Sequence, residues 1–218
     1  MGSHMRRKLN TAGILTIAAA ISACSSGDQT YFETEGLRAP VAICTVKPDN
    51  LGIAERLRDI DENNGCHVDN AWRVMTVADV TFSRPATVNC GVVGPLNDWL
   101  AKTVQPAARD QFSEAVTGID IAASYSCRPR NNTRGAKMSE HGYGNAIDIS
   151  AFTLASGRRV TVRDGWRGNS GERAFLRHVR SDACGRFATV LGPGSDRHHG
   201  DHFHLDMQNR PSGRAYCR

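Results

Sequence analysis

The chain has little proline and no repeated sequence unit: its 218 residues include only 8 prolines. A proline-rich structural glycoprotein and a collagen-like or low-complexity chain are therefore excluded. Apolar residues make up 40% and charged residues 22% of the chain, which is close to globular averages and argues against disorder. The length predicts one domain with a buried core, with or without an appended segment.

Long apolar runs are also missing, except near the N-terminus. We interpret Met1–Met5 as the remnant of a tag, followed by the basic residues 6–8 and an apolar run over 11–20. That run is shorter than the roughly 20 residues that a membrane-spanning helix needs, and the layout is typical of a secretory signal. It ends at Ile21-Ser22-Ala23-Cys24, which resembles a bacterial lipobox and implies lipidation of Cys24. Ser25 then resembles an outer-membrane sorting residue.

These features predict three segments. Residues 1–23 are a tag remnant and lipoprotein signal peptide, 24–40 a polar tether, and 41–218 the folded domain. The predicted location is the periplasmic side of the envelope, anchored by lipid at the outer membrane; ordinary signal cleavage nearby is the alternative to lipidation.

Charge of one sign is scarce once this leader is set aside. The net charge of the whole chain is +5, but residues 1–23 contain three basic and no acidic residues, which leaves +2 for the remainder. No basic stripe is present, so nucleic acid is not an expected partner. The mild positive balance suits an anionic envelope polymer.

The chain has seven cysteines but no CxxC pair, which argues against a cysteine zinc site. With Cys24 lipidated, the remaining even set behind an export signal predicts disulfide bonds. Sequence alone leaves the pairing open. We predict the pairs Cys44–Cys66, Cys90–Cys127 and Cys184–Cys217, the last of which would join the C-terminus to a nearby helix.

Hydrophobic patterns predict a mixed fold. Apolar residues recur at helical spacing from Leu96 to Val116, with an interruption expected at Pro106. Short helices are predicted over Ala54–Asp61 and Glu172–Val179. Strands are predicted over 72–79, 86–92, 119–126, 145–152, 158–162, 187–191 and 202–207. Because strands and helices do not alternate regularly, we predict an α+β single domain, with a mostly antiparallel sheet and helices on one side.

Five of the eight histidines lie in two segments, 139–148 and 198–206. If the second segment is a strand, His202, His204 and Asp206 point to one face and two imidazoles converge on a small volume. Histidine and carboxylate ligands fit zinc, and a catalytic zinc keeps one position open for water.

The first segment supplies a carboxylate for the same site. Asp148 lies among apolar strand residues, where a carboxylate is costly unless it is paired or bound to metal. Gly142 and Gly144 let the chain turn tightly, so that His141 and Asp148 can meet. Each feature alone has a structural explanation, such as a surface histidine or a turn cap; their conjunction predicts a metal site.

The motifs also carry a resemblance. The pattern S-x-H-x-x-G-x-A-x-D is met by Ser139, His141, Gly144, Ala146 and Asp148, and a late H-x-H follows. It resembles the signature of the zinc D-alanyl-D-alanine carboxypeptidases, the penicillin-insensitive murein endopeptidase and the hedgehog signalling domain. More narrowly, about Cys90 to Cys217 resembles the bacterial extensin-like C-terminal domain family, through SYSCRPRN (124–131), SEHGYGNAIDI (139–149), VLGPG (190–194) and HHGDHFHLD (198–206).

This resemblance implies a hedgehog- or DD-peptidase-like fold and a set of roles. It implies that zinc is bound by His141, Asp148 and His204. His202 matches the active-site base or transition-state stabiliser, and His199 a further active-site histidine. Carboxypeptidase members often carry a glutamate near the position of His202. The nearest acid here is Asp201, which favours the endopeptidase-like arrangement.

Three further residues complete the expected site. Arg128 matches an arginine that follows a strand in these peptidases and would hold a substrate carboxylate or carbonyl oxygen, with Arg130 and Arg134 as rivals. Ser139 is expected to orient a ligand, and Asp206 to orient His202 or His204 through its free ring nitrogen.

The sequence therefore predicts a zinc metallopeptidase that hydrolyses an amide bond in peptidoglycan stem peptides or cross-links, as a DD- or LD-endopeptidase rather than a carboxypeptidase. Peptidoglycan is the expected partner, with the membrane reached through the lipid on Cys24. Two alternatives belong to other classes. One is a non-catalytic peptidoglycan-binding lipoprotein with a structural zinc closed by a fourth protein ligand. The other is a zinc carrier with loosely held metal.

Overall fold

Strands dominate the structure, a computed structural model that describes residues 52–62 and 64–218. Among these residues the strands are β1 (Ala54–Arg56), β2 (Ile60–Glu62), β3 (Cys66–Val68), β4 (Ala71–Val77), β5 (Val80–Asn89), β6 (Val116–Ala123), β7 (Ala146–Leu154), β8 (Arg159–Thr161), β9 (Thr189–Leu191), β10 (Phe203–Asp206) and β11 (Tyr216–Cys217). The helices are α1 (Cys90–Trp99), the π-helical η2 (Leu100–Val104), α2 (Gln105–Phe112), the 3₁₀ turns η3 (Arg130–Asn132) and η4 (Glu140–Tyr143), α3 (Val162–Gly165) and α4 (Ser170–Ala183). All lie within one compact unit.

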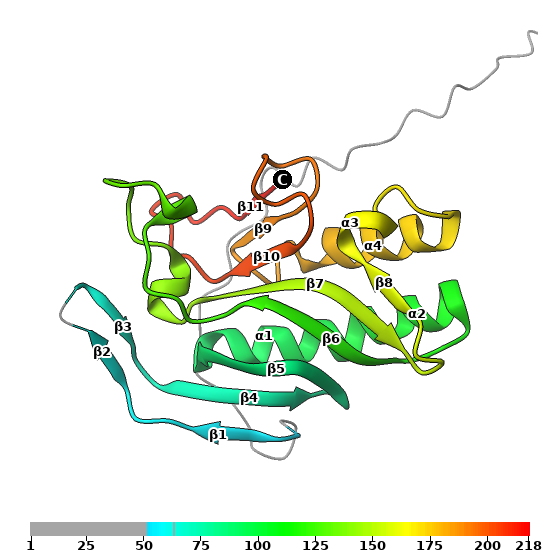
Figure 1. Ribbon diagram of the computed structural model, residues 1–218, viewed down its shortest axis with the longest axis horizontal. Helices are drawn as coiled ribbons and strands as arrows, with labels where there is room; N and C mark the ends of the chain where they lie inside the picture. The colour runs from blue at the N-terminus through cyan, green and yellow to red at the C-terminus, as the bar shows by residue number, and fades with distance from the viewer. Residues whose placement is uncertain (1–51, 63) are drawn as a thin grey trace, which may run out of the picture. The chain divides into compact units, whose positions relative to one another are not determined.

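One large sheet organises the described residues (Figure 1). Its strand order is β1-β4-β5-β6-β7-β10-β9-β11, with β8 paired to β7, and β2 and β3 form a separate hairpin. The pairs β5–β6 and β9–β11 are parallel, whereas the others are antiparallel. The α+β prediction with a mostly antiparallel sheet is therefore confirmed.

The helices between β5 and β6 pack against the sheet and close its core. Trp99 of α1 is fully buried, and its ring contacts Phe152 of β7 and Phe187 edge-on. Its indole N–H donates to the carbonyl of Val179 in α4 at 2.8 Å, so the polar edge of the ring is satisfied. The interruption expected at Pro106 is confirmed, since η2 separates α1 from α2 and the proline lies in the first turn of α2.

Strands β7 and β10 divide the molecule into a core side and a polar side. Phe203 lies opposite Ile149 and Leu205 opposite Ile147, and all four side chains are buried in the main core. Because successive residues of a strand point to opposite faces, the residues between them lie on the other face. That second face carries Asp148, His204 and Asp206.

Two local predictions are wrong. Residues 54–61 do not form a helix: Ala54 pairs with Val74 in the sheet, and Ile60 pairs with Val68 in the hairpin. Pairing with a neighbouring strand outweighs the weak local helical pattern. The strand predicted over 86–92 ends at Asn89, whose extended backbone leads directly into α1. The predicted strands near β4, β6, β7, β8, β9 and β10, and the helix near α4, are present with shifted ends.

Candidate metal centre and surrounding cleft

Three side chains from separate parts of the chain meet on the polar face. Asp148 and His204 are direct cross-strand partners on β7 and β10, and His141 comes from η4. The Nδ1 of His204 lies 2.8 Å from Oδ1 of Asp148, and Nε2 of His141 lies 3.1 Å from Oδ2. Each residue offers one ligand atom, and the three atoms lie within 4.8 Å of one another. All three residues are buried, and this group can hold a metal ion.

The tautomer of His141 supports a cation at this position. Its Nδ1 lies 2.7 Å from the carbonyl of Ser124, which can only accept, so Nδ1 donates and carries the proton in the neutral ring. The other nitrogen, Nε2, is buried and has no hydrogen-bond partner among the described residues. Its lone pair and a carboxylate oxygen of Asp148, both acceptors, thus approach within 3.1 Å. A bound cation relieves this contact, so the residues fit a metal.

His204 lies between two buried carboxylates. Its Nδ1 contacts Asp148, and its Nε2 lies 3.0 Å from Oδ2 of Asp206. Burial opposes a charge on the ring, but the hydrogen bonds to both carboxylates outweigh it and raise the pKa of His204 to about 10. Burial would raise the pKa of Asp148, yet the hydrogen bonds and charges of His141 and His204 in their protonated forms lower it overall. Binding of a metal by His204 therefore requires loss of a ring proton.

Two more histidines form the rim, each held by its own aspartate. His202 directs Nδ1 to Oδ1 of Asp201 at 2.8 Å and presents Nε2 3.6 Å from Oδ2 of Asp148. Arg163 donates to the other oxygen of Asp201 at 2.8 Å. His199 is held in the same way, because its Nδ1 lies 2.8 Å from Oδ1 of Asp196. The ring centroids of His199 and His202 lie 5.2 Å apart.

Each of these four histidines thus has one ring nitrogen in a hydrogen bond with an oxygen atom outside the centre. Such contacts fix the tautomer and orientation of an imidazole, and leave the other nitrogen for the site. Asp206 was expected to contact His202 or His204, and it contacts His204. Sequence reasoning missed the contacts of Asp196 and Asp201, although both acids stand one to three residues before the histidines that they hold.

A cleft of about 380 Å³ opens over the centre, and its lining includes the four histidines described above and His198. Arg128 and Arg130 also line it, whereas Arg134 is exposed and is not among the lining residues. Arg130 is exposed and pairs with Glu140 at 3.4 Å. Arg128 is half-buried and forms no side-chain ion pair or hydrogen bond with another described residue, so its guanidinium is available to a ligand.

Arg210 is a lining residue that the sequence analysis missed. Its guanidinium donates to the carbonyl of Ala188 at 2.8 Å, to the hydroxyl of Thr189 at 2.5 Å and to the side-chain oxygen of Gln208 at 2.8 Å. Tyr216, also in the wall, lies under it, with the guanidinium carbon 5.8 Å from the ring centroid. No local motif marks Arg210, because its position depends on hydrogen bonds to Ala188 and Thr189, about twenty residues away in the sequence.

A second opening adjoins the first on the far side of His202. It has a volume of about 510 Å³ and shares Asp148 and His202 with the first cleft. Arg159 and Arg163 lie in its wall, paired with Asp120 and Asp201 respectively. Asp148 and His202 therefore border both openings.

The turn that carries His141 is held by close packing. Ser139 caps it by accepting from the backbone N–H of His141 at 3.4 Å, so this serine contacts the backbone of a candidate ligand rather than its ring. Gly144 has a left-handed backbone with φ of 57°, and a Cβ there would lie 2.6 Å from Val68. A Cβ on Gly142 would lie 3.0 Å from Sγ of Cys66. Both glycines are needed, as predicted, although Gly142 for packing rather than for φ.

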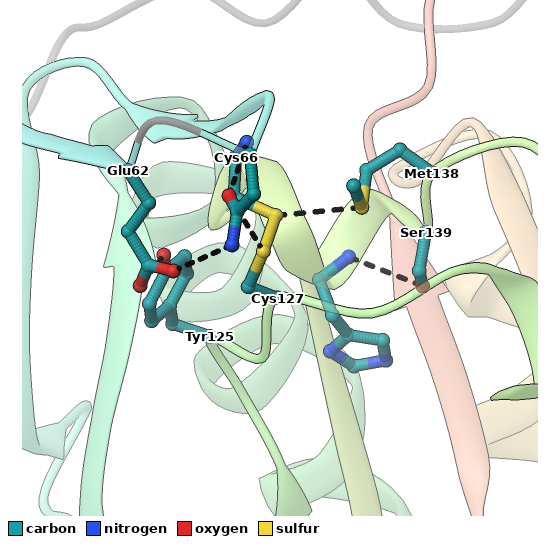
Figure 2. The surroundings of a disulfide bond; sticks show 8 residues. Glu62, Cys66, Tyr125, Cys127, Met138 and Ser139 are labelled. Atoms are coloured by element: carbon teal, nitrogen blue, oxygen red, sulfur yellow. Dashed lines mark hydrogen bonds between the residues drawn. A yellow bond between two sulfur atoms is a disulfide. The ribbon is translucent and has the colours of Figure 1, made fainter.

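The disulfide behind this turn corrects the predicted pairing. Cys66 of β3 is bonded to Cys127, 61 residues further along the chain, beside Met138 and Ser139 (Figure 2). The predicted pairs Cys44–Cys66 and Cys90–Cys127 are therefore wrong. They joined cysteines that are near in sequence, whereas the packing of β3 against η4 brings Cys66 to the loop that precedes η4.

The pair Cys184–Cys217 is confirmed and ties the end of α4 to β11. Cys90 is disulfide-bonded as well. The predicted lipidation of Cys24, the signal over 1–23 and the tether over 24–40 lie outside the described residues. No helix in the described ranges is long and apolar enough to cross a membrane.

Comparison with known families gives a match that covers most of the chain. The family described as "Extensin-like protein C-terminus" matches residues 42–218. The class of protein is thus an α+β domain that carries a buried group of two histidines and one aspartate. The chain is a member of the extensin-like C-terminal family. Neither a curated protein nor a solved structure matches it.

Proposed function

We propose that this protein is a zinc-dependent peptidoglycan peptidase that cuts an amide bond in cross-linked stem peptides. The observation that carries the proposal is the buried, unpartnered Nε2 of His141, which faces Asp148 and lies beside His204 at the base of an open cleft. Three ligands of this kind with an open position are typical of catalytic zinc. When bound, zinc supplies the Lewis acidity that activates water and polarises a carbonyl.

The residues around the centre suit the proton transfers of amide hydrolysis. His202, oriented by Asp201, is the proposed base, because its Nε2 is the nitrogen turned toward the centre. It takes a proton from the attacking water and returns it to the leaving amine. His199 lies next to it, and burial lowers its pKa, which favours the neutral form that can accept a proton. Arg128 holds the developing oxyanion or a substrate carboxylate.

The two openings support an endopeptidase rather than a carboxypeptidase. A carboxypeptidase binds a chain end, so a wall beyond the scissile bond is sufficient. Here the clefts of about 380 and 510 Å³ meet at His202 and Asp148, which leaves room for peptide on both sides. The bond cut would be a D-alanyl cross-link or a diaminopimelate cross-link.

The predicted compartment is part of the same proposal. The disulfides Cys66–Cys127 and Cys184–Cys217 support an oxidising compartment such as the periplasm. Lipidation of Cys24 and anchoring at the outer membrane rest on the N-terminal sequence alone. Mass spectrometry of the protein from a Gram-negative host tests the anchor, since an unmodified Cys24 would remove it.

A non-catalytic wall-binding protein with a structural zinc is the second candidate. The observation in its favour is the short reach of His202, whose Nε2 lies 3.6 Å from Oδ2 of Asp148 and could close the site as a fourth ligand. The zinc carrier has no comparable support, because the three candidate ligands are buried.

Digestion of purified sacculi separates these candidates. We expect the zinc-loaded protein to remove cross-linked dimers, as measured by liquid chromatography and mass spectrometry of muropeptides, and His204→Ala to remove none. Product masses identify the bond. Loss of only a terminal alanine would indicate a carboxypeptidase. Binding to sacculi with zinc at one per chain and no released product would favour the structural-zinc candidate.

A further inference from the structure

A third cleft, of about 410 Å³, lies beside the metal cleft on the side of the β2–β3 hairpin. Its wall combines His67 and Asp69 at the end of β3 with Tyr143 of η4 and Asn209 after β10. Glu140 and Gln208 line both this cleft and the metal cleft, so the two are adjacent. We call this third cleft the hairpin cleft.

The charge of the hairpin cleft differs from that of the metal cleft. The metal cleft has three arginines in its wall, Arg128, Arg130 and Arg210, together with four carboxylates, Glu140, Asp148, Asp196 and Asp206. The hairpin cleft has two carboxylates, Asp69 and Glu140, and no lysine or arginine. Only the metal cleft therefore has guanidinium groups that can pair with an anionic group, and the hairpin cleft suits a ligand without negative charge.

Amide side chains give the hairpin cleft both donors and acceptors. Asn89 donates to Oδ1 of Asn145 at 3.1 Å, and Asn145 donates to Glu140 at 2.8 Å, so these side chains are held in a chain of hydrogen bonds. The remaining oxygen of Asn89, Oδ1, is buried and has no partner in the part of the chain that the structure describes. Asn209 is exposed at the mouth. An ammonium ligand needs acceptors only, whereas hydroxyl and acetamido groups use both kinds of atom.

Two rings form an apolar part of the same wall. The ring centroids of His67 and Tyr143 lie 5.1 Å apart with an interplanar angle of 56°. His67 is exposed and Tyr143 half-buried, so ring surface is open to a ligand. A flat apolar surface beside amide groups suits a ligand with an apolar face and polar edges.

We infer that the hairpin cleft binds a neutral N-acetylated sugar, and thereby seats the glycan strand while the stem peptide enters the metal cleft. This inference rests on the proposed function for its biological substrate, but not for the binding itself. It also gives a role to the β2–β3 hairpin, which the Cys66–Cys127 bond fixes beside η4.

The test is binding of chitotetraose, a neutral N-acetylglucosamine oligomer, to the full chain in the presence of a chelator. We expect millimolar binding, with amide resonances of 67–69, 143–145 and 208–209 shifting in two-dimensional NMR. We expect His67→Ala to weaken binding roughly five- to tenfold through loss of the ring contact. Asn209→Ala is the second variant, and His178→Ala, an exposed histidine of α4, is the matched control without effect.

Salt and a second ligand sharpen the result. Binding of a neutral sugar changes little with ionic strength, whereas binding of a cation to Asp69 and Glu140 weakens. Shifts elsewhere on the protein, no shifts at about 10 mM sugar, or salt-sensitive binding of lysine amide in place of the sugar would overturn the inference. Because metal is absent, a failure here is distinct from a failure to release muropeptides.

Discussion

The two faces of β7 and β10 share one backbone and one register but differ in what their side chains need. On the core face, Ile147 and Phe203 are stabilised by removal of apolar surface from water, and each makes its contribution largely alone. On the polar face, Asp148 and His204 are also buried, but each depends on the other. The core face therefore tolerates exchanges between apolar side chains of similar volume, whereas the polar face does not tolerate a change of charge.

The largest effect is expected on the polar face. Asp148→Asn keeps the shape of the side chain and removes its charge, so a metal is no longer bound against His141 and His204. We expect metal content to fall from one per chain to near zero by elemental analysis. Muropeptide release should fall roughly a thousandfold, which corresponds to several kcal/mol of transition-state stabilisation.

Asp98→Asn is the matched control, because Asp98 is a half-exposed aspartate paired with Lys102 on α1. It should leave both quantities unchanged. Full metal content and activity in Asp148→Asn would show that the polar face has no metal role, and the contrast between the faces would reduce to packing.

The core face should fail in a different way. Phe203→Ala removes a ring that is fully buried against Phe152 and Trp166. We expect the free energy of unfolding in urea to fall by about 3–5 kcal/mol. Phe112→Ala, which truncates a half-buried ring, should cost clearly less. If Phe203→Ala instead kept its stability but lost metal, the faces would not be independent.

A smaller effect is expected behind the polar face, at the aspartate that orients His202. Asp201→Ala removes the acceptor for Nδ1 of His202, so the ring loses its fixed orientation. We expect kcat on a cross-linked peptide to fall about 10- to 100-fold, with metal content unchanged. Asp201→Asn keeps an acceptor oxygen and should recover part of the loss.

The double variant makes this prediction sharper. In a His202→Ala background, Asp201→Ala should have little further effect, because the two residues act as one unit. Additive losses would mean that Asp201 acts through Arg163 or the fold instead.

Local patterns in the sequence predicted the residues on each face of β7 and β10, but not the contacts made by distant loops. Alternation along 202–207 and the apolar setting of Asp148 were local signals, and they led to the correct face and to residues that do meet. The contacts of Cys127 and Arg210 depend on which segments pack together, for which the sequence offers no spacing rule, whereas Asp196 lies only three residues before His199. The pairing of Cys66 with Cys127 follows from packing across 61 residues. Ala54–Arg56 and Ile60–Glu62 form strands because neighbouring strands are available to pair with them.

The smallest effect is expected at a contact outside both faces, where Tyr125 donates to Glu62 at 2.5 Å and joins the β2–β3 hairpin to the loop before η4 (Figure 2). Burial, followed by the hydrogen bond and the charge of Glu62, raises the pKa of Tyr125 to about 12 from 10.0. A group whose pKa is raised by folding makes its full contribution to stability at any pH below its pKa in the unfolded chain. Its contribution should therefore be intact below pH 10 and lost as the pH rises toward 12.

Tyr125→Phe should lower the free energy of unfolding by about 0.5–1.5 kcal/mol at neutral pH. The difference from the natural protein should vanish above pH 12 in urea unfolding. Absorbance titration of both proteins identifies the tyrosine involved, and a Tyr125 that titrates near 10 would mean that the hairpin is not held by this bond.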